Sequence, residues 1–292
     1  MTKPTPPILG AHQSIAGGHH RAVERAAAVG CSCVQLFTKN NNQWRAAPLP
    51  DDAGPRFQAA LRRAGIRHTV AHNSYLINLA SPDRELWRRS VEAMLEELRR
   101  ADALGIPGLV AHPGAHTTGT ERGGLSRIVR AIDRIHRRGA ELRSRIMLET
   151  TAGQGTCLGW RFQHLAEIIQ RVREPERLGV CFDTCHVFAA GYDLRTRRVY
   201  RATMRKFDRV VGLNRIEAIH LNDSRRDLGS RVDRHEHIGR GHLGEEAFEH
   251  LLHDRRLRHV PMYLETPKGK ERGTDNDVLN LRTLRRLAAR GK

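Results

Sequence analysis

Six apolar runs in the sequence each end in a histidine or an acidic residue. These residues are His72, His112, Glu149, Asp183, His220 and Glu265. Two local spacings add further donors, because His186 follows Asp183 by three residues and His235 follows Asp233 by two. Imidazole nitrogens and carboxylate oxygens suit Zn²⁺ or Mn²⁺, and no cysteine is placed to join them. The pattern therefore predicts a metal site.

The nine donor side chains are too many for a single metal ion. Three closed tetrahedral sites would need about twelve ligand bonds, whereas nine side chains with one bridging carboxylate give about ten. The difference leaves positions for water and substrate, so we expect three ions. Any one of these histidines, taken alone, would more often be an ordinary hydrogen-bonded or surface residue. Their recurrence at successive strand ends favours ligands.

The elements that must position these residues alternate regularly along the chain. Strands are expected at 8–12, 33–38, 69–73, 109–113, 146–150, 179–184, 218–223 and 262–266, and helices at 18–29, 53–64, 82–104, 123–142, 162–172, 200–211, 245–253 and 276–290. Eight βα units in 292 residues predict an α/β fold, a (β/α)₈ TIM barrel forming a single domain over residues 1–292. Because all strands of such a barrel end at one face, the donors should converge there.

The composition is strongly basic, with 50 Lys and Arg against 32 Asp and Glu and a net charge of +18. This excess suits a polyanionic partner, although a general arginine bias explains much of it equally well. No run approaches the about 18 apolar residues of a membrane span, and the first residues lack a signal-peptide pattern. We therefore expect a cytoplasmic protein with no membrane partner. Five cysteines without a CxxC pair argue against a disulfide framework.

A series of short motifs runs in order along nearly the whole chain. They include Leu36-Phe37-Thr38-Lys39-Asn40, His72-Asn73-Ser74-Tyr75-Leu76-Ile77-Asn78-Leu79, His112-Pro113-Gly114, Phe182-Asp183-Thr184-Cys185-His186, Gly229-Ser230-Arg231-Val232-Asp233-Arg234-His235 and Leu264-Glu265-Thr266-Pro267. In these motifs the chain resembles endonuclease IV, a family of metal-dependent apurinic/apyrimidinic endonucleases of base-excision DNA repair. The resemblance implies a TIM barrel that acts on double-stranded DNA containing abasic sites. It implies hydrolysis of the phosphodiester 5′ of the site, leaving 3′-hydroxyl and 5′-deoxyribose phosphate ends.

The resemblance also implies how the nine residues divide among three zinc ions per chain. His72, His112 and Glu149 would hold the first; Glu149 with Asp183, His220 and Glu265 the second; and His186, Asp233 and His235 the third. Glu149 would be the catalytic bridging ligand that holds the nucleophilic hydroxide. Mn²⁺ is an alternative at one or more of these sites. Four carboxylates and three Zn²⁺ leave −4 + 6 = +2, which suits a phosphate ligand.

The resemblance implies DNA contacts outside the metal site. Gln43, Tyr75 and Leu76 match loop residues with which the family fills the space left by the abasic nucleotide. Taken alone, Tyr75 and Leu76 would more often be core or loop-anchoring residues. Arg231 and Arg234 flank the third set of metal ligands and are expected phosphate contacts, the alternative being solvated loop charges.

Three further positions bear on the site. Asn42 stands where a basic residue is common in the family, which puts a DNA-backbone or stacking contact in doubt. Thr150 stands where Asn is usual, which removes a possible supporting amide after Glu149. His12 is a candidate supporting residue for the metal ligands or a phosphate contact.

Two other functions remain open at this point. A divalent-metal sugar isomerase or epimerase would use a similar barrel, but it needs only one or two metals and no DNA-contacting loop. The additional set of His186, Asp233 and His235 argues against it, as does the basic excess. A non-catalytic DNA-damage-binding protein is difficult to reconcile with a complete ligand set. One barrel acting on one lesion needs no partner subunit, so we expect a monomer.

Overall fold

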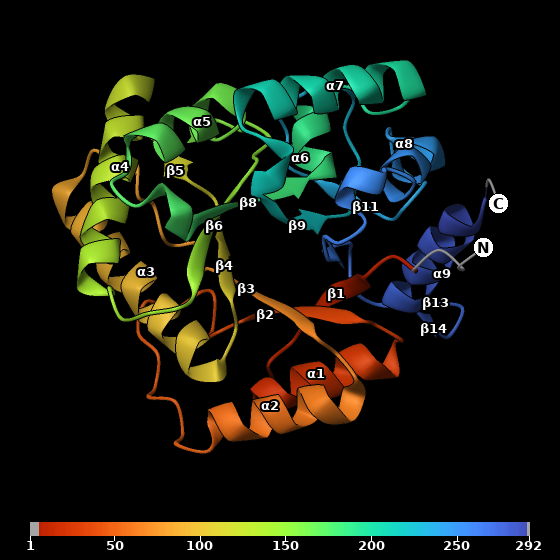
Figure 1. Cartoon of the computed structure of the whole chain (residues 1–292), viewed down its shortest axis with the longest axis horizontal. Helices are drawn as coiled ribbons and strands as arrows, with labels where there is room; N and C mark the ends of the chain where they lie inside the picture. The colour runs from red at the N-terminus through yellow and green to blue at the C-terminus, as the bar shows by residue number, and fades with distance from the viewer. Residues whose placement is uncertain (1–5, 291–292) are drawn as a thin grey trace.

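The computed structural model describes residues 6–290, and at its centre is a closed barrel of eight parallel strands surrounded by helices (Figure 1). The barrel strands are β1 (Leu9–Gln13), β2 (Cys33–Phe37), β3 (His68–His72), β4 (Gly108–Ala111), β6 (Arg145–Glu149), β8 (Leu178–Asp183), β9 (Ile216–His220) and β12 (Met262–Leu264). Around the barrel they follow one another in chain order, and β12 closes it by pairing with β1. The predicted (β/α)₈ TIM barrel is confirmed.

A helix follows each barrel strand and covers the outside of the barrel. The main helices are α1 (His19–Ala28), α2 (Ala53–Ala64), α3 (Arg84–Leu104), α4 (Glu121–Arg138), α5 (Phe162–Arg171), α7 (Arg197–Val210), α8 (Gly244–Leu252) and α9 (Asn276–Ala289). Local signals set the ends of the longest, α3. Asp83 caps its first turn by accepting from the backbone N–H groups of Glu85 and Leu86, and Gly105 ends it in the left-handed conformation, with φ 70°.

Several short elements were not predicted. They are helix α6 (Thr184–Ala189) and the paired segments β5 (Gly114–Ala115) with β7 (Cys157–Leu158), β10 (Asp223–Ser224) with β11 (His235–Glu236), and β13 (Lys270–Glu271) with β14 (Thr274–Asp275). Two-residue strands are too short to leave a periodic pattern in the sequence. The strand expected at 109–113 is also shorter at its carboxyl end than predicted. β4 stops at Ala111, and Pro113 has no N–H group to donate to a sheet.

The barrel interior is built in layers because inward-facing side chains recur at every second position of a strand. One layer is a separate apolar cluster of Cys33, Val70, Val110, Met147, Cys181, Ala218 and Tyr263. Two residues further along each of the same strands stand Gln35, His72, His112, Glu149, Asp183, His220 and Glu265. The pleat therefore places a polar layer at the carboxyl end of the barrel, directly above an apolar layer.

Candidate active site

The nine side chains expected to bind metal lie together at the carboxyl end of the barrel. Six of them stand at or just beyond the ends of β3, β4, β6, β8, β9 and β12. His186 lies in α6, His235 lies in β11, and Asp233 stands just before β11. Donor atoms within 4.8 Å of one another form three sets: His72, His112 and Glu149; Glu149, Asp183, His220 and Glu265; and Asp183, His186 and His235. Residues separated by up to 193 positions (265 − 72) thus meet at one mouth.

Glu149 lies between the first two sets and is completely buried. Its Oε2 atom is 3.1 Å from Nε2 of both His72 and His112. Its Oε1 atom is 2.9 Å from Nδ1 of His220. The two oxygens of one carboxylate therefore face two different groups of donors, which is the arrangement a bridging ligand requires.

The third set is completed by Asp233, which stands just before β11. Its Oδ1 atom lies 3.1 Å from Nε2 of His186 and 3.5 Å from Nε2 of His235. The pairing of β10 with β11 folds this segment back over the mouth, and Gln154 accepts a hydrogen bond of 2.9 Å from the Asp233 N–H. Asp183 lies 3.8 Å from His235 and so joins this set to the second.

Three of the histidines are oriented by backbone carbonyl groups. Nδ1 donates from His72 to Asn73 at 2.9 Å, from His186 to Thr150 at 2.9 Å and from His235 to Glu265 at 3.3 Å. A carbonyl oxygen only accepts, so each Nδ1 carries a proton and each Nε2 faces the site as the atom that would bind a metal. Histidine ligands of metals are characteristically held in this way.

Four carboxylates gather at the site, and within residues 6–290 none has an ion pair with lysine or arginine: Glu149, Asp183, Asp233 and Glu265. Burial alone would raise the pKa of Glu149, but His220 and His112 outweigh it and hold that pKa well below its ordinary value. Burial alone would lower the pKa of His220, but the carboxylates of Glu265 and Glu149 raise it well above its ordinary value. The buried carboxylates thus need positive charge, either as protons on the histidines or as cations.

The donor set fits divalent metal ions. It offers nitrogen and oxygen atoms in three adjoining groups, and the three carbonyl-bound histidines already face the site through Nε2. One detail corrects the sequence analysis, which placed no cysteine here. Cys181 Sγ lies within 4.8 Å of ligand atoms of Glu149 and His220, because it faces inward two residues before Asp183. Burial raises the pKa of Cys181 to about 12, so its thiol stays protonated and belongs to the apolar layer.

Two buried amides that the sequence analysis did not single out support the carboxylates and His220. Gln35 donates from Nε2 to Glu265 at 2.6 Å and accepts from Nε2 of His220 at 2.7 Å, which directs Nδ1 of His220 into the site. Asn222 donates to Asp183 at 2.7 Å and accepts from the backbone N–H of Glu265 at 2.9 Å. These amides fix both the orientation and the tautomer of the groups they contact.

The alternation of side chains along the strands carried the signal for Gln35. Counting two positions beyond the inward-facing apolar residue gives a ligand on β3, β6, β8 and β9, and the same count from Cys33 on β2 gives Gln35. His12 of β1 pairs with Gln35 at the same level of the barrel, and its ring accepts from Gln35 at 3.0 Å. Burial lowers the pKa of His12 to about 3, so its ring is neutral. His12 therefore contacts the ligands through Gln35.

The two positions that depart from the family pattern have different surroundings. Asn42 lies exposed on its loop, where its backbone N–H donates to the side chain of Asn40 at 2.9 Å. Thr150 is buried, and its hydroxyl accepts from the backbone N–H of Asp183 at 2.9 Å while its carbonyl holds His186. The threonine thus supports two ligands with its hydroxyl and carbonyl oxygens.

Tyr75 and Leu76 lie on the loop that follows β3, directly after the ligand His72. Tyr75 is 65 % exposed and is the one exposed large hydrophobic residue within 6–290. Its ring centre lies 5.9 Å from that of His72 and 5.8 Å from that of Phe37. Leu76 is half-buried. An aromatic ring thus stands in solvent at the edge of the donor cluster, which a core residue would not do.

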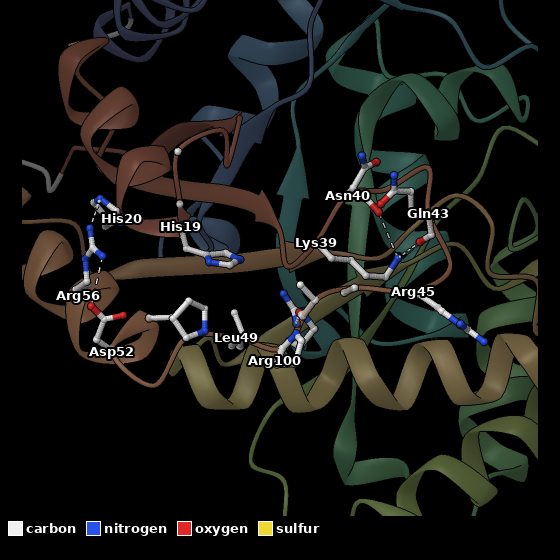
Figure 2. A pocket seen from close by; sticks show the side chains of 17 residues that line it. His19, His20, Lys39, Asn40, Gln43, Arg45, Leu49, Asp52, Arg56 and Arg100 are labelled. Atoms are coloured by element: carbon white, nitrogen blue, oxygen red, sulfur yellow. Dashed lines mark hydrogen bonds and ion pairs between the residues drawn. The ribbon is translucent and has the colours of Figure 1, made fainter.

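Gln43 lies on the loop between β2 and α2, beside a hollow of about 390 Å³ (Figure 2). The buried Lys39 points toward this loop and donates to the Gln43 carbonyl at 2.5 Å. Arg100 of α3 donates to the carbonyl groups of Thr38 and Ala47. Lys39 and Arg100 therefore hold the loop from within, and the side chain of Gln43 remains exposed.

Arg231 and Arg234 lie exposed on either side of Asp233. The Arg231 guanidinium stacks on the ring of Trp160, with its Cζ 3.8 Å from the ring centre. Arg231 has a left-handed backbone, with φ 53°, a conformation that is uncommon outside glycine. Arg234 donates to the Asp233 carbonyl at 2.5 Å. Both cations thus stand beside the third ligand set.

Comparisons with known proteins agree with this geometry. Residues 23–286 match the xylose isomerase-like TIM barrel family. A protein of Chloroflexus aggregans named "Probable endonuclease 4" is 50 % identical over 281 residues, which cover 96 % of this chain and 98 % of that protein. The structure of endonuclease IV from Thermus thermophilus superimposes with a TM-score of 0.85 at 36 % identity, covering 96 % of this chain and 98 % of that one.

Sugar epimerases share the barrel at much lower identity. D-psicose 3-epimerase from Clostridium cellulolyticum has a TM-score of 0.64 and 15 % identity, over 96 % of this chain and 95 % of that one, which shows a common fold alone. Among the described residues, no helix combines the length and apolar character that crossing a bilayer requires. The identity to the first two proteins extends over nearly their whole lengths, and this chain belongs to the endonuclease IV family.

Proposed function

We propose that this chain is a zinc-dependent apurinic/apyrimidinic endonuclease of base-excision repair, which hydrolyses the phosphodiester 5′ of an abasic site in double-stranded DNA. Its main support is the convergence of nine nitrogen and oxygen donors beneath an exposed aromatic residue at one barrel mouth. Family membership supports the endonuclease activity. The abasic substrate, the position of the cut and the reaction products are proposed in addition to this activity.

Three Zn²⁺ ions would be held by the three sets of side chains, with Glu149 shared between the first two and Mn²⁺ as an alternative occupant. When bound, such ions polarise phosphoryl oxygens and lower the pKa of bound water to about 7. Gln35, Asn222 and Thr150 keep the ligands in place before substrate arrives. In the reaction a water oxygen bonds to phosphorus, the P–O3′ bond breaks and O3′ leaves with a proton.

The loop residues would recognise the lesion. Extracting a nucleotide from duplex DNA costs a few kcal/mol, and an abasic nucleotide costs least because it has no base to unstack. Tyr75 and Leu76 would occupy the vacated stack, and Gln43 would contact the same region from the neighbouring loop. Ser74 joins these two loops by donating to the Asn41 carbonyl at 2.5 Å, so they act as one unit.

Arg231 and Arg234 would bind phosphates beside the third ligand set. Stacking on Trp160 restrains the Arg231 side chain, which reduces the entropy cost of binding an anion. A DNA substrate is consistent with a cytoplasmic, nucleoid-associated enzyme, and one barrel suffices as a monomer for one lesion. A sugar isomerase or epimerase remains the alternative, but it gives no role to the exposed Tyr75.

A nicking assay tests the proposal. Purified protein is incubated with a duplex that carries one abasic analogue and with the same duplex undamaged. We expect a single cut on the 5′ side of the lesion, a 3′-hydroxyl that a polymerase extends, and loss of cutting after chelation. Isomerisation of a ketose without DNA cleavage would support the epimerase instead.

The exposed residues of the β3–α3 loop permit a separate test of lesion recognition. Replacing both Tyr75→Ala and Leu76→Ala should weaken binding to abasic duplex by roughly tenfold, since stacking on an aromatic ring is worth about 1–3 kcal/mol. Binding to undamaged duplex and metal content should not change. A loss of bound metal in this variant would instead assign the two residues a structural role.

A further inference from the structure

A basic groove lies between the outer surfaces of α3 and α4, which run side by side on the barrel wall (Figure 1). It is lined by Ser81, Pro82, Arg84, Glu85, Trp87, Arg88, Arg127, Arg130 and Arg134 and has a volume of about 600 Å³. Five arginines and one glutamate give this lining a net charge of 5 − 1 = +4. None of the residues is a proposed metal ligand or one of the expected DNA contacts Gln43, Tyr75, Leu76, Arg231 and Arg234.

The arginines of the groove have no carboxylate partner within residues 6–290, although arginines elsewhere on these helices do. Arg138, one turn beyond Arg134 on α4, pairs with Glu92 of α3. Burial, together with the nearby charge of Arg130, lowers the pKa of Arg127. Positive charges are thus held close together without the anion that would offset their repulsion.

Two buried guanidinium atoms in the groove also lack a hydrogen-bond partner within 6–290. They are Nη2 of Arg127 and Nε of Arg134. Arg127 is anchored through Nε, which donates to the Ala80 carbonyl at 2.7 Å. A buried polar atom without a partner is unusual in a native protein. These two guanidinium groups thus keep hydrogen-bonding capacity that residues 6–290 do not use.

The upper end of the groove adjoins the mouth of the barrel. Ser81 and Pro82 end the same loop that carries Tyr75 and Leu76, and Arg84 and Arg88 lie in the first turns of α3. Ser81 follows His72 by nine residues, which is at most about 30 Å of chain. At 3.4 Å per base pair, Ser81 therefore lies no more than about nine base pairs of duplex from His72.

We propose that the α3–α4 groove binds the phosphate backbone of the duplex arm on one side of the lesion, independently of the lesion itself. This inference rests on the proposed function, because it takes the substrate to be duplex DNA. Five guanidinium groups suit phosphates, which they bind through paired N–H groups. Backbone contacts of this kind carry no sequence information and make affinity depend on salt.

The test uses a triple variant, Arg84→Gln, Arg88→Gln and Arg130→Gln, which alters only exposed side chains. A matched control, Arg205→Gln, Arg255→Gln and Arg258→Gln, removes the same charge from exposed arginines around the hollow between α7 and α8. The duplexes carry one abasic analogue and form two series. In each series one arm keeps about twenty base pairs and the other is shortened stepwise from about twenty to about three, because about nine base pairs is an upper limit on the distance to the groove.

We expect the groove variant to bind the long duplex about tenfold more weakly, with the salt slope reduced by about 0.9 for each phosphate that is no longer bound. This weakening should persist at every arm length in one series and disappear in the other once the shortened arm no longer reaches the groove. The control should bind all the duplexes as the unaltered protein does. An equal weakening in both variants, or the same weakening at every arm length in both series, would overturn the proposed role of the groove. If the unaltered protein binds no duplex, the proposed function itself fails.

Discussion

Two layers of side chains inside the barrel occupy equivalent positions on the same strands, yet their chemistry is opposite. The lower layer, which contains Val70, Val110 and Met147, is apolar and closes the barrel. The upper layer, two residues further along, contains His72, His112 and Glu149 and buries charge without lysine or arginine partners. Two residues along each strand thus separate the side chains that stabilise the barrel from those expected to perform chemistry.

An inward-facing position on a barrel strand does not by itself make an active site. Both layers face inward, and both are almost inaccessible to solvent at Met147 and Glu149. The difference is that the upper layer meets the loops, from which amides and carbonyl groups reach the ligands. Substitutions in the upper layer should therefore affect metal and turnover, whereas those in the lower layer should affect stability.

The largest expected effect comes from Glu149→Gln. This change removes the charge at the position shared by two ligand sets, so turnover should fall by about a thousandfold or more, as when preorganised electrostatic groups are removed. Affinity for abasic duplex should fall much less. Single-turnover cleavage and equilibrium binding measure the two quantities, and equal losses in both would contradict a bridging role.

Met147→Ala, on the same strand, is the matching change in the lower layer. Truncation of a buried methionine should lower the free energy of unfolding by about 2–5 kcal/mol. Metal content and cleavage at low temperature should stay near those of the unaltered protein. Thermal unfolding with metal analysis tests this, and loss of metal at unchanged stability would remove the distinction between the layers.

Gln35→Leu should have an intermediate effect, because Gln35 lies in the upper layer without being an expected ligand. Loss of its hydrogen bonds to His220 and Glu265 should weaken metal affinity by about 10–100-fold. Competition with a chelator measures this. The control is Gln13→Leu, which removes a buried hydrogen bond of 2.7 Å to Asp277 instead. If both variants bind metal equally well, Gln35 does not position the ligands.

The smallest expected effect is that of pH on metal binding. In the metal-free protein the pKa values of His186 and His220 are well above 6.5, since the carboxylates outweigh burial. These rings therefore hold protons at pH 7, and metal must displace them. Affinity should rise with pH, by about tenfold per pH unit for each proton displaced. Calorimetry in buffers of different ionisation enthalpy checks this, and binding without proton release would contradict it.

Much of the barrel and of the donor set could be predicted because local patterns encode them. Each strand shows an apolar run, and a ligand stands where the run ends, as in Leu148-Glu149 or Ile219-His220. Gln35 and Cys181 follow the same two-residue alternation, but their contacts with Glu265 and His220 could not be predicted, since those contacts depend on which strands become neighbours. The exposure of Tyr75 and the unpaired arginines of the α3–α4 groove are likewise properties of the assembled surface.

The central claim is that the upper layer, together with His186, Asp233 and His235, binds three metal ions that are needed for cutting. The most direct measurement is a titration of metal-free protein with Zn²⁺, with bound metal and 5′ incision of an abasic duplex followed together. We predict no cutting before metal is added and a plateau at three equivalents per chain. Full cutting by protein proven free of metal, or a plateau at one equivalent, would contradict the claim.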